Sequence, residues 1–108
     1  MKFGMLYELQ LPKPWDEEAE LRLIEEATEQ IVLADQIGVD HAWAVEHHFL
    51  EEYSHCSASD VFLASLAAKT ERIRIGLGIR QVIPNYNHPS RSAETVAMLD
   101  LISRGRAE

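Results

Sequence analysis

Cysteine is nearly absent from the sequence, since Cys56 is the only one among 108 residues. An internal disulfide is therefore impossible, and the cysteine count gives no reason to expect an oxidising compartment. Long apolar runs are also absent, because no stretch approaches the roughly 20 residues that a membrane-spanning helix needs. The amino terminus lacks a basic segment followed by an apolar signal core. Together these absences predict a cytoplasmic protein that does not enter membranes.

Positive charge is scarce. The chain has 10 Lys and Arg residues against 18 Asp and Glu residues, a formal net charge of -8, and its basic residues are scattered along the sequence. Nucleic-acid binding needs a concentrated positive surface for phosphate contacts, so this class of partner is excluded. An acidic surface of this kind chiefly keeps a protein soluble.

Apolar residues make up 46% of the chain, enough for the core of one small domain. Short apolar runs predict buried strands over residues 2–8, 41–46 and 73–79. Apolar residues at intervals of three and four predict helices over residues 16–38, 57–69 and 89–105. Trp43, in the second run, and Phe62, in the second helix, are expected in the core.

Each predicted helix has an end signal. Asp16 is expected to cap the first helix, and Gly38 is expected to end it in a left-handed conformation. The segment Ser57–Asp60 has the form of a capping box, with Asp in the place usually held by Glu or Gln. Pro89 suits the first turn of the third helix, and His88 before it is expected to cap that helix rather than to act in catalysis.

The alternation of strand and helix indicates an α/β fold. The predicted strands lie roughly 30 residues apart along the chain, the spacing of right-handed parallel βαβ units. A sheet of three parallel strands has two open edges, and parallel sheets are almost always covered and continued. The sheet is therefore expected to continue, either in further sequence or in a partner chain.

Three segments carry more specific information, namely residues 46–49 (EHHF), 82–89 (VIPNYNHP) and 94–106 (ETVAMLDLISRGR). Each is a weak signal alone. In this order and spacing they resemble the bacterial luciferase-like flavin-dependent monooxygenase family, and the resemblance extends from Lys2 to Glu108.

The resemblance implies that residues 1–108 form the amino-terminal portion of a (β/α)8 TIM barrel, with its first three β/α units. A complete barrel needs about 250 residues, so the sequence is expected to be a fragment that is inactive alone. The phosphate-anchoring residues of the family come from later strands and are expected beyond Glu108.

The resemblance also implies a chemistry. The family takes reduced FMN from a separate flavin reductase, reacts it with O2 and inserts one oxygen atom into a small organic substrate. A dimer of two copies, or with a related subunit, is implied for the full-length chain. Two alternatives remain open: hydride transfer with the deazaflavin F420 on the same fold, and a noncatalytic barrel subunit.

In such a barrel the active site is built from loops at the carboxyl ends of the strands. This rule alone indicates a set of five residues: Tyr7, Glu8, Glu46, His47 and Gln81. By resemblance, His47 matches the catalytic histidine of the family. An imidazole titrates near neutrality and can hold or move a proton there. Without the resemblance, His47 could equally be a histidine that closes a strand end by hydrogen bonding.

The other candidate residues are divided between cofactor and substrate. Those expected to lie against the cofactor are Glu46, Ile79, Arg80 and Gln81. Those expected to line the substrate pocket are Tyr7, Glu8 and His48. His48 has a weaker claim to catalysis than His47, because neighbouring side chains on an extended segment point to opposite faces. Glu8 and Glu46 could also orient His47, or simply be solvated or paired within the protein.

A metal site competes for the same segment. The possible zinc ligands are Glu46, His47, His48, His55 and Cys56. Their spacing matches no common ligand pattern, and adjacent histidines on a strand cannot readily share one metal ion. No metal site is therefore predicted.

Overall fold

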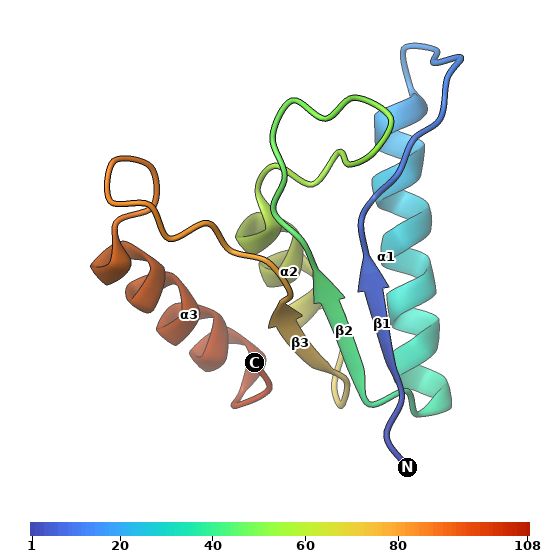
Figure 1. The fold of residues 1–108 in the computed structure, drawn as a ribbon. Helices are drawn as coiled ribbons and strands as arrows, with labels where there is room; N and C mark the ends of the chain where they lie inside the picture. The colour runs from blue at the N-terminus through green and yellow to red at the C-terminus, as the bar shows by residue number, and fades with distance from the viewer.

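The computed structural model describes residues 1–108. Its elements alternate along the chain in the order β1 (Gly4–Tyr7), α1 (Ala19–Ile37), β2 (His41–Ala44), α2 (Ser59–Ala67), β3 (Arg74–Leu77) and α3 (Pro89–Ser103). Each lies within a range that the sequence predicts, and each is shorter than that range. Figure 1 shows the three strands side by side, with long loops leaving their carboxyl ends.

The strands form one parallel sheet in the order β1-β2-β3, which confirms the predicted topology. Tyr7 is paired with Ala44, and Ala44 with Leu77, so the three strands end at the same level. Their carboxyl ends therefore meet at a single edge. The loops that follow β1, β2 and β3 all start there (Figure 1).

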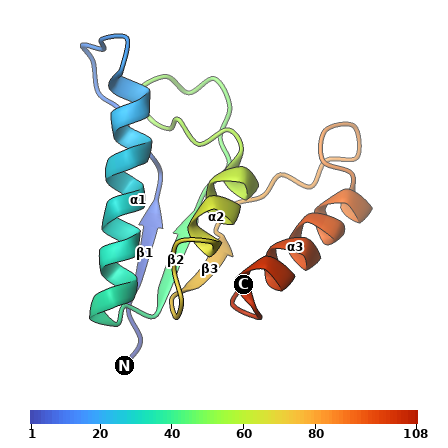
Figure 2. The same cartoon turned by 180° about the vertical axis from the view of Figure 1, so that it is seen from behind.

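Helices α1 and α2 cover one face of the sheet, and no helix lies on the other (Figures 1 and 2). Ala42, Ala44 and Ile75 point to the covered face and are almost fully buried, in one core cluster with Ile31 of α1 and Leu66 of α2. This single layer of helices on a parallel sheet is the arrangement of consecutive β/α units in a barrel.

Trp43 is more exposed than predicted. Its side chain is 38% exposed, whereas Phe62, the other expected core aromatic, is 8% exposed. Side chains alternate between the two faces of a strand, so the neighbours of buried Ala42 and Ala44 must point to the uncovered face. Trp43 lies there level with Leu6 of β1, which is 60% exposed. The same face becomes the interior when a barrel closes.

The observed helix ends agree in part with the predicted caps. Gly38 follows α1 with φ 90°, and the His88 ring accepts a hydrogen bond from Ser90 N–H, as predicted. The predicted capping box is wrong, because Ala58 holds the cap position of α2 and makes no side-chain bond. Asp16 bonds the N–H of Glu18 but lies in a turn before α1.

The last residues of the chain extend the sheet beyond β3. The N–H of Ile75 donates to the carbonyl of Arg106 at 2.9 Å, and the N–H of Glu108 donates to the carbonyl of Ile75 at 2.8 Å. Ala107 is paired with Ile75 in a parallel bridge. The open edge of the sheet is thus continued by a fourth parallel segment, as parallel sheets require.

None of the helices combines the length and the apolar character that crossing a membrane requires.

Candidate active site at the carboxyl edge of the sheet

The two histidines that follow β2 face different neighbours. The Nε2 of His47 is 3.5 Å from Oε2 of Glu8, which directly follows β1. The Nε2 of His48 is 3.1 Å from Oε1 of Glu46 and 2.8 Å from the hydroxyl of Tyr86, in the loop after β3. Adjacent side chains on an extended segment point in opposite directions, and here this brings one histidine to each neighbouring strand.

Glu8 and His47 are both held by backbone geometry. Leu9, immediately after Glu8, is buried and has φ 52°, a left-handed conformation that is uncommon outside glycine. The N–H of His47 donates to the carbonyl of Cys56 at 3.0 Å. The His47 ring packs edge-on against Tyr53, with 5.5 Å between ring centroids. The imidazole is therefore restrained on several sides.

Glu46 joins the end of β2 to the loop after β3. Its side chain is 3% exposed, and both of its oxygens have protein partners. Asn87 donates its amide N–H to Oε1 at 2.9 Å, and the backbone N–H of Gln81 donates to Oε2 at 3.3 Å. Burying a carboxylate is costly unless donors surround it, and these contacts supply such donors to Glu46.

Arg80 binds within the protein rather than pointing into open space. Its guanidinium is 3.3 Å from Asp60 of α2 and 3.9 Å from Glu46. It also donates to the side chains of Asn87 and Ser92, each at 3.4 Å. The Arg80 side chain thus anchors the loop.

Tyr7 lies apart from these residues. Its hydroxyl donates to Oε1 of Gln30 in α1 at 3.3 Å, and burial raises its pKa above the ordinary value. The structure therefore brings together Glu8, Glu46, His47, His48 and Gln81 at the edge of the sheet, while Tyr7 points toward α1.

A hollow of about 610 Å³ lies over the edge of the sheet. The loops after β1 and β2 supply its aromatic, aliphatic and histidine walls, which include Trp15, His47, His48, Phe49, Leu50 and His55. Sequence reasoning missed Tyr53 and Tyr86, which contact the two histidines, and Asn87, which donates to Glu46. The position of Tyr86 and Asn87 inside the motif at residues 82–89 was the available signal.

The side chains present fit a flat, largely apolar ring. Leu6 and Trp43 are exposed and apolar on the uncovered face of the sheet, and Ile79, just after β3, is 41% exposed. A Cβ at Gly78 would lie 3.1 Å from the Leu6 side chain, so the backbone there is closely packed. No three His, Cys, Asp or Glu side chains are grouped as metal ligands. For a phosphate, the guanidinium of Arg80 is already engaged by protein groups.

Sequence comparison extends these observations. The profile of the family described as "Luciferase-like monooxygenase" matches residues 1–108. The oxygenase component of flavin-dependent trigonelline monooxygenase from Acinetobacter baylyi is 32% identical over 110 residues, covering 100% of this chain and 29% of that protein.

Structural comparison agrees. The crystal structure of monooxygenase RslO1 from Streptomyces bottropensis matches with a TM-score of 0.83 and 37% identity, over 100% of this chain and 32% of that one. The coenzyme F420-dependent tetrahydromethanopterin reductase from Methanopyrus kandleri matches with a TM-score of 0.68 and 29% identity, over 98% of this chain and 25% of that one. The chain thus spans about a third or less of the length of these proteins. With its whole length matched by the family profile and by the RslO1 structure, the chain belongs to the luciferase-like monooxygenase family.

Proposed function

We propose that the chain is the amino-terminal portion of a flavin-dependent monooxygenase, which uses reduced FMN to insert one oxygen atom of O2 into a small organic substrate. The observation that carries this proposal is the location of His47 at the carboxyl edge of β2, with its ring 3.5 Å from Glu8. In barrel enzymes the catalytic groups lie at this edge. Family membership supports the same reading of the site.

Reduced FMN, when bound, supplies the electrons that the reduction of O2 requires. His47 holds or moves a proton beside the reacting atoms, because imidazole exchanges protons near neutral pH. Glu46 fixes the backbone of Gln81, and through it the segment that follows β3. Leu6 and Trp43 offer an apolar surface to the ring and keep water from it.

A flavin reductase is the proposed supplier of reduced FMN. The trigonelline enzyme is named as an oxygenase component, which supports a two-protein system of this kind. Glu8 and His48 face the substrate in this proposal. His48 lines the hollow over the sheet edge, and Glu8 lies behind His47, which also lines it.

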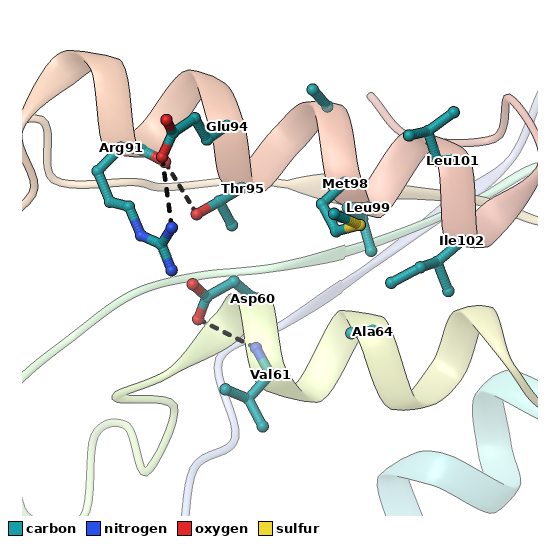
Figure 3. Close-up of a pocket in the computed structure, with 11 residues that line it drawn as sticks. Asp60, Val61, Ala64, Arg91, Glu94, Thr95, Met98, Leu99, Leu101 and Ile102 are labelled. Atoms are coloured by element: carbon teal, nitrogen blue, oxygen red, sulfur yellow. Dashed lines mark hydrogen bonds and ion pairs between the residues drawn. The ribbon is translucent and has the colours of Figure 1, made fainter.

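We also propose that the full-length protein forms a dimer through α2 and α3. A groove of about 700 Å³ runs between these helices (Figure 3). Its apolar walls include Val61, Met98 and Leu101, all more than half exposed. Single exposed apolar residues are ordinary, but a contiguous apolar groove marks an interaction surface.

A second copy of the chain is the proposed occupant of the groove. Figure 3 shows Arg91 reaching from α3 toward Asp60 of α2 at one end, and Arg91 is 3.3 Å from Glu94. The rim thus carries both signs of charge around an apolar floor. A two-fold interface pairs a surface with itself, and a surface of mixed charge can complement its own copy.

Hydride transfer with F420 is the second candidate function. The similarity to an F420-dependent reductase, at 29% identity over nearly the whole chain, favours it. The two candidates use the same barrel edge and differ in the cofactor and in the need for O2.

Cofactor titration of the complete polypeptide tests both candidates. We expect it to bind reduced FMN in preference to F420 and to incorporate one atom of ¹⁸O₂ into product. His47→Ala should abolish turnover. His41→Ala is the matched control and should keep activity. His41 is at the amino end of the same strand, away from the candidate site, and lies 3.2 Å from Glu108. Tight F420 binding with no oxygen incorporation would establish the second candidate instead.

A further inference from the structure

The carboxylates of Glu8 and Glu46 differ in how they are bound. Both oxygens of Glu46 accept hydrogen bonds from the protein. Oε2 of Glu8 is buried and accepts none, while the ring nitrogen Nε2 of His47 lies 3.5 Å away. A buried carboxylate oxygen without a donor is costly, so a donor aimed at it is strongly favoured. Glu8 therefore has an open place for an N–H from His47.

Backbone contacts hold the two side chains opposite each other. Leu9 turns the chain after Glu8 with φ 52°, and its carbonyl accepts the N–H of His55 at 2.9 Å. The N–H of His47 donates to the carbonyl of Cys56 at 3.0 Å. Glu8 and His47 are thus tied through neighbouring residues to the same short segment, and small movements of the side chains suffice to close the 3.5 Å gap.

The direction of the histidine ring decides which nitrogen can react. A carboxylate facing Nε2 keeps the proton on that nitrogen, so Nδ1 carries the lone pair. The edge-on contact with Tyr53 restrains rotation of the ring. In hydrolases that pair a histidine with a buried carboxylate, the carboxylate selects the tautomer and stabilises the imidazolium. The geometry here offers the same division of labour.

We propose that Glu8 is a positioning residue that fixes His47 in the Nε2–H tautomer, so that Nδ1 is the atom that accepts a proton from the bound reactants. The Glu8 carboxylate stabilises the resulting imidazolium, and the same proton leaves Nδ1 later in the cycle. No electron passes through the pair. The kinetic part of this inference rests on the proposed function, whereas the tautomer can be observed without turnover.

The test replaces Glu8 by Gln in the complete polypeptide, with ¹⁵N-labelled histidine. In the wild type we expect the His47 signals of a protonated Nε2 and an unprotonated Nδ1, and in Glu8→Gln a mixture of tautomers. We expect kcat to fall on the order of 10²- to 10⁴-fold with KM unchanged, as when a carboxylate partner of a catalytic histidine is removed. Glu108→Gln is the matched control, because Glu108 is 3.2 Å from Nε2 of His41, at the amino end of β2, and should leave His47 unaffected.

Several results would overturn the proposal. A wild-type spectrum with the proton on Nδ1 would do so. Equal losses of kcat in Glu8→Gln and Glu108→Gln, or an altered tautomer with unchanged kcat, would do so as well. If the wild-type protein oxygenates nothing, the proposed function fails, and the wild-type tautomer then decides the pairing by itself. If Glu8→Gln does not fold, Glu8→Asp keeps the charge but withdraws it from His47, and should show the same effects in weaker form.

Discussion

Asp35, in α1, accepts a hydrogen bond from the backbone N–H of Ile73 at 2.6 Å, which joins this helix to the residue just before β3. The same carboxylate accepts the N–H groups of Arg72 at 2.7 Å and Glu71 at 3.0 Å. Burial alone would raise the pKa of Asp35. The three N–H donors and the charge of Arg72 have the opposite and larger effect, so the pKa lies below the ordinary value. One side chain thereby holds the loop that brings β3 into the sheet.

Replacing Asp35 by Asn is expected to destabilise the protein by about 1–3 kcal/mol. The asparagine amide has only one acceptor oxygen for the three backbone N–H groups. Its NH2 group would replace the second carboxylate oxygen and would face an N–H donor that it cannot accept. Urea unfolding of the complete protein measures the change. Glu29→Gln, on the exposed surface of the same helix, is the control and should change stability by less than about 0.5 kcal/mol. Equal effects of the two substitutions would contradict the role of Asp35.

The pH dependence of stability follows from the same carboxylate. The pKa of Asp35 is lower in the folded state than in the unfolded state, so its stabilising effect is complete above the unfolded value, about 4, and is lost as the pH falls through the folded value. The difference in urea midpoint between wild type and Asp35→Asn should therefore narrow between about pH 5 and pH 2. A difference in urea midpoint that widens on acidification would show that folding does not lower the pKa of Asp35.

Much of the fold could be predicted from the sequence because local patterns and topology agree. Short apolar runs separated by periodic stretches permit little besides parallel βαβ units, and the register confirms them. Trp43 was misassigned because an apolar side chain alone does not reveal which face of a sheet is covered. The apolar periodicity of α3 likewise did not reveal which side of the helix is covered, since that helix buries Ser92, Leu99 and Ser103.

The candidate site was harder to predict. The rule that barrel sites lie at strand ends found Glu8, Glu46 and His47, since it depends only on where strands stop. It could not show that Glu46 is fully hydrogen-bonded while Glu8 is not, because the donors come from loops distant in the sequence. The prediction that Glu46 contacts the cofactor therefore remains a prediction, and its observed contacts are with protein groups.

Arg106 offers a further test of stability. Its guanidinium donates to the carbonyl oxygens of Ala67, Thr70, Ile73 and Ser103, at 2.7 to 3.0 Å, and so closes the end of α2. Lysine cannot reproduce this planar fork.

Arg106→Lys is accordingly expected to cost about 2–3 kcal/mol in the free energy of unfolding. The control is Arg104→Lys, two positions earlier, because the Arg104 side chain is exposed and makes no hydrogen bond within the protein. Thermal or urea denaturation of the complete protein measures both. A loss in Arg104→Lys as large as that in Arg106→Lys would rule out the guanidinium contacts as the cause.

Cys56 is expected to be unreactive in the folded protein. Burial raises the pKa of its thiol to about 11, and the carboxylates of Glu46, Asp60 and Glu8 add to the effect. At pH 8 roughly one thiol in a thousand is then the reactive thiolate. Labelling with iodoacetamide, followed by peptide mass spectrometry, should modify Cys56 slowly under native conditions and rapidly in urea. Fast native labelling would mean that the loop around Cys56 opens readily.

The proposed dimer gives the last prediction. Leu101 of α3 is 73% exposed in the single chain and lines the groove between α2 and α3. A glutamate there would be stranded in an apolar interface without a partner, a severe penalty for association but a small one for an isolated chain. The complete wild-type protein should therefore sediment as a dimer and Leu101→Glu as a folded monomer. Leu21→Glu, exposed on α1 and remote from the groove, should remain dimeric. A monomeric wild type would show that the groove does not bind a second copy. A dimeric Leu101→Glu would show the same, because a buried charge in the interface should prevent association.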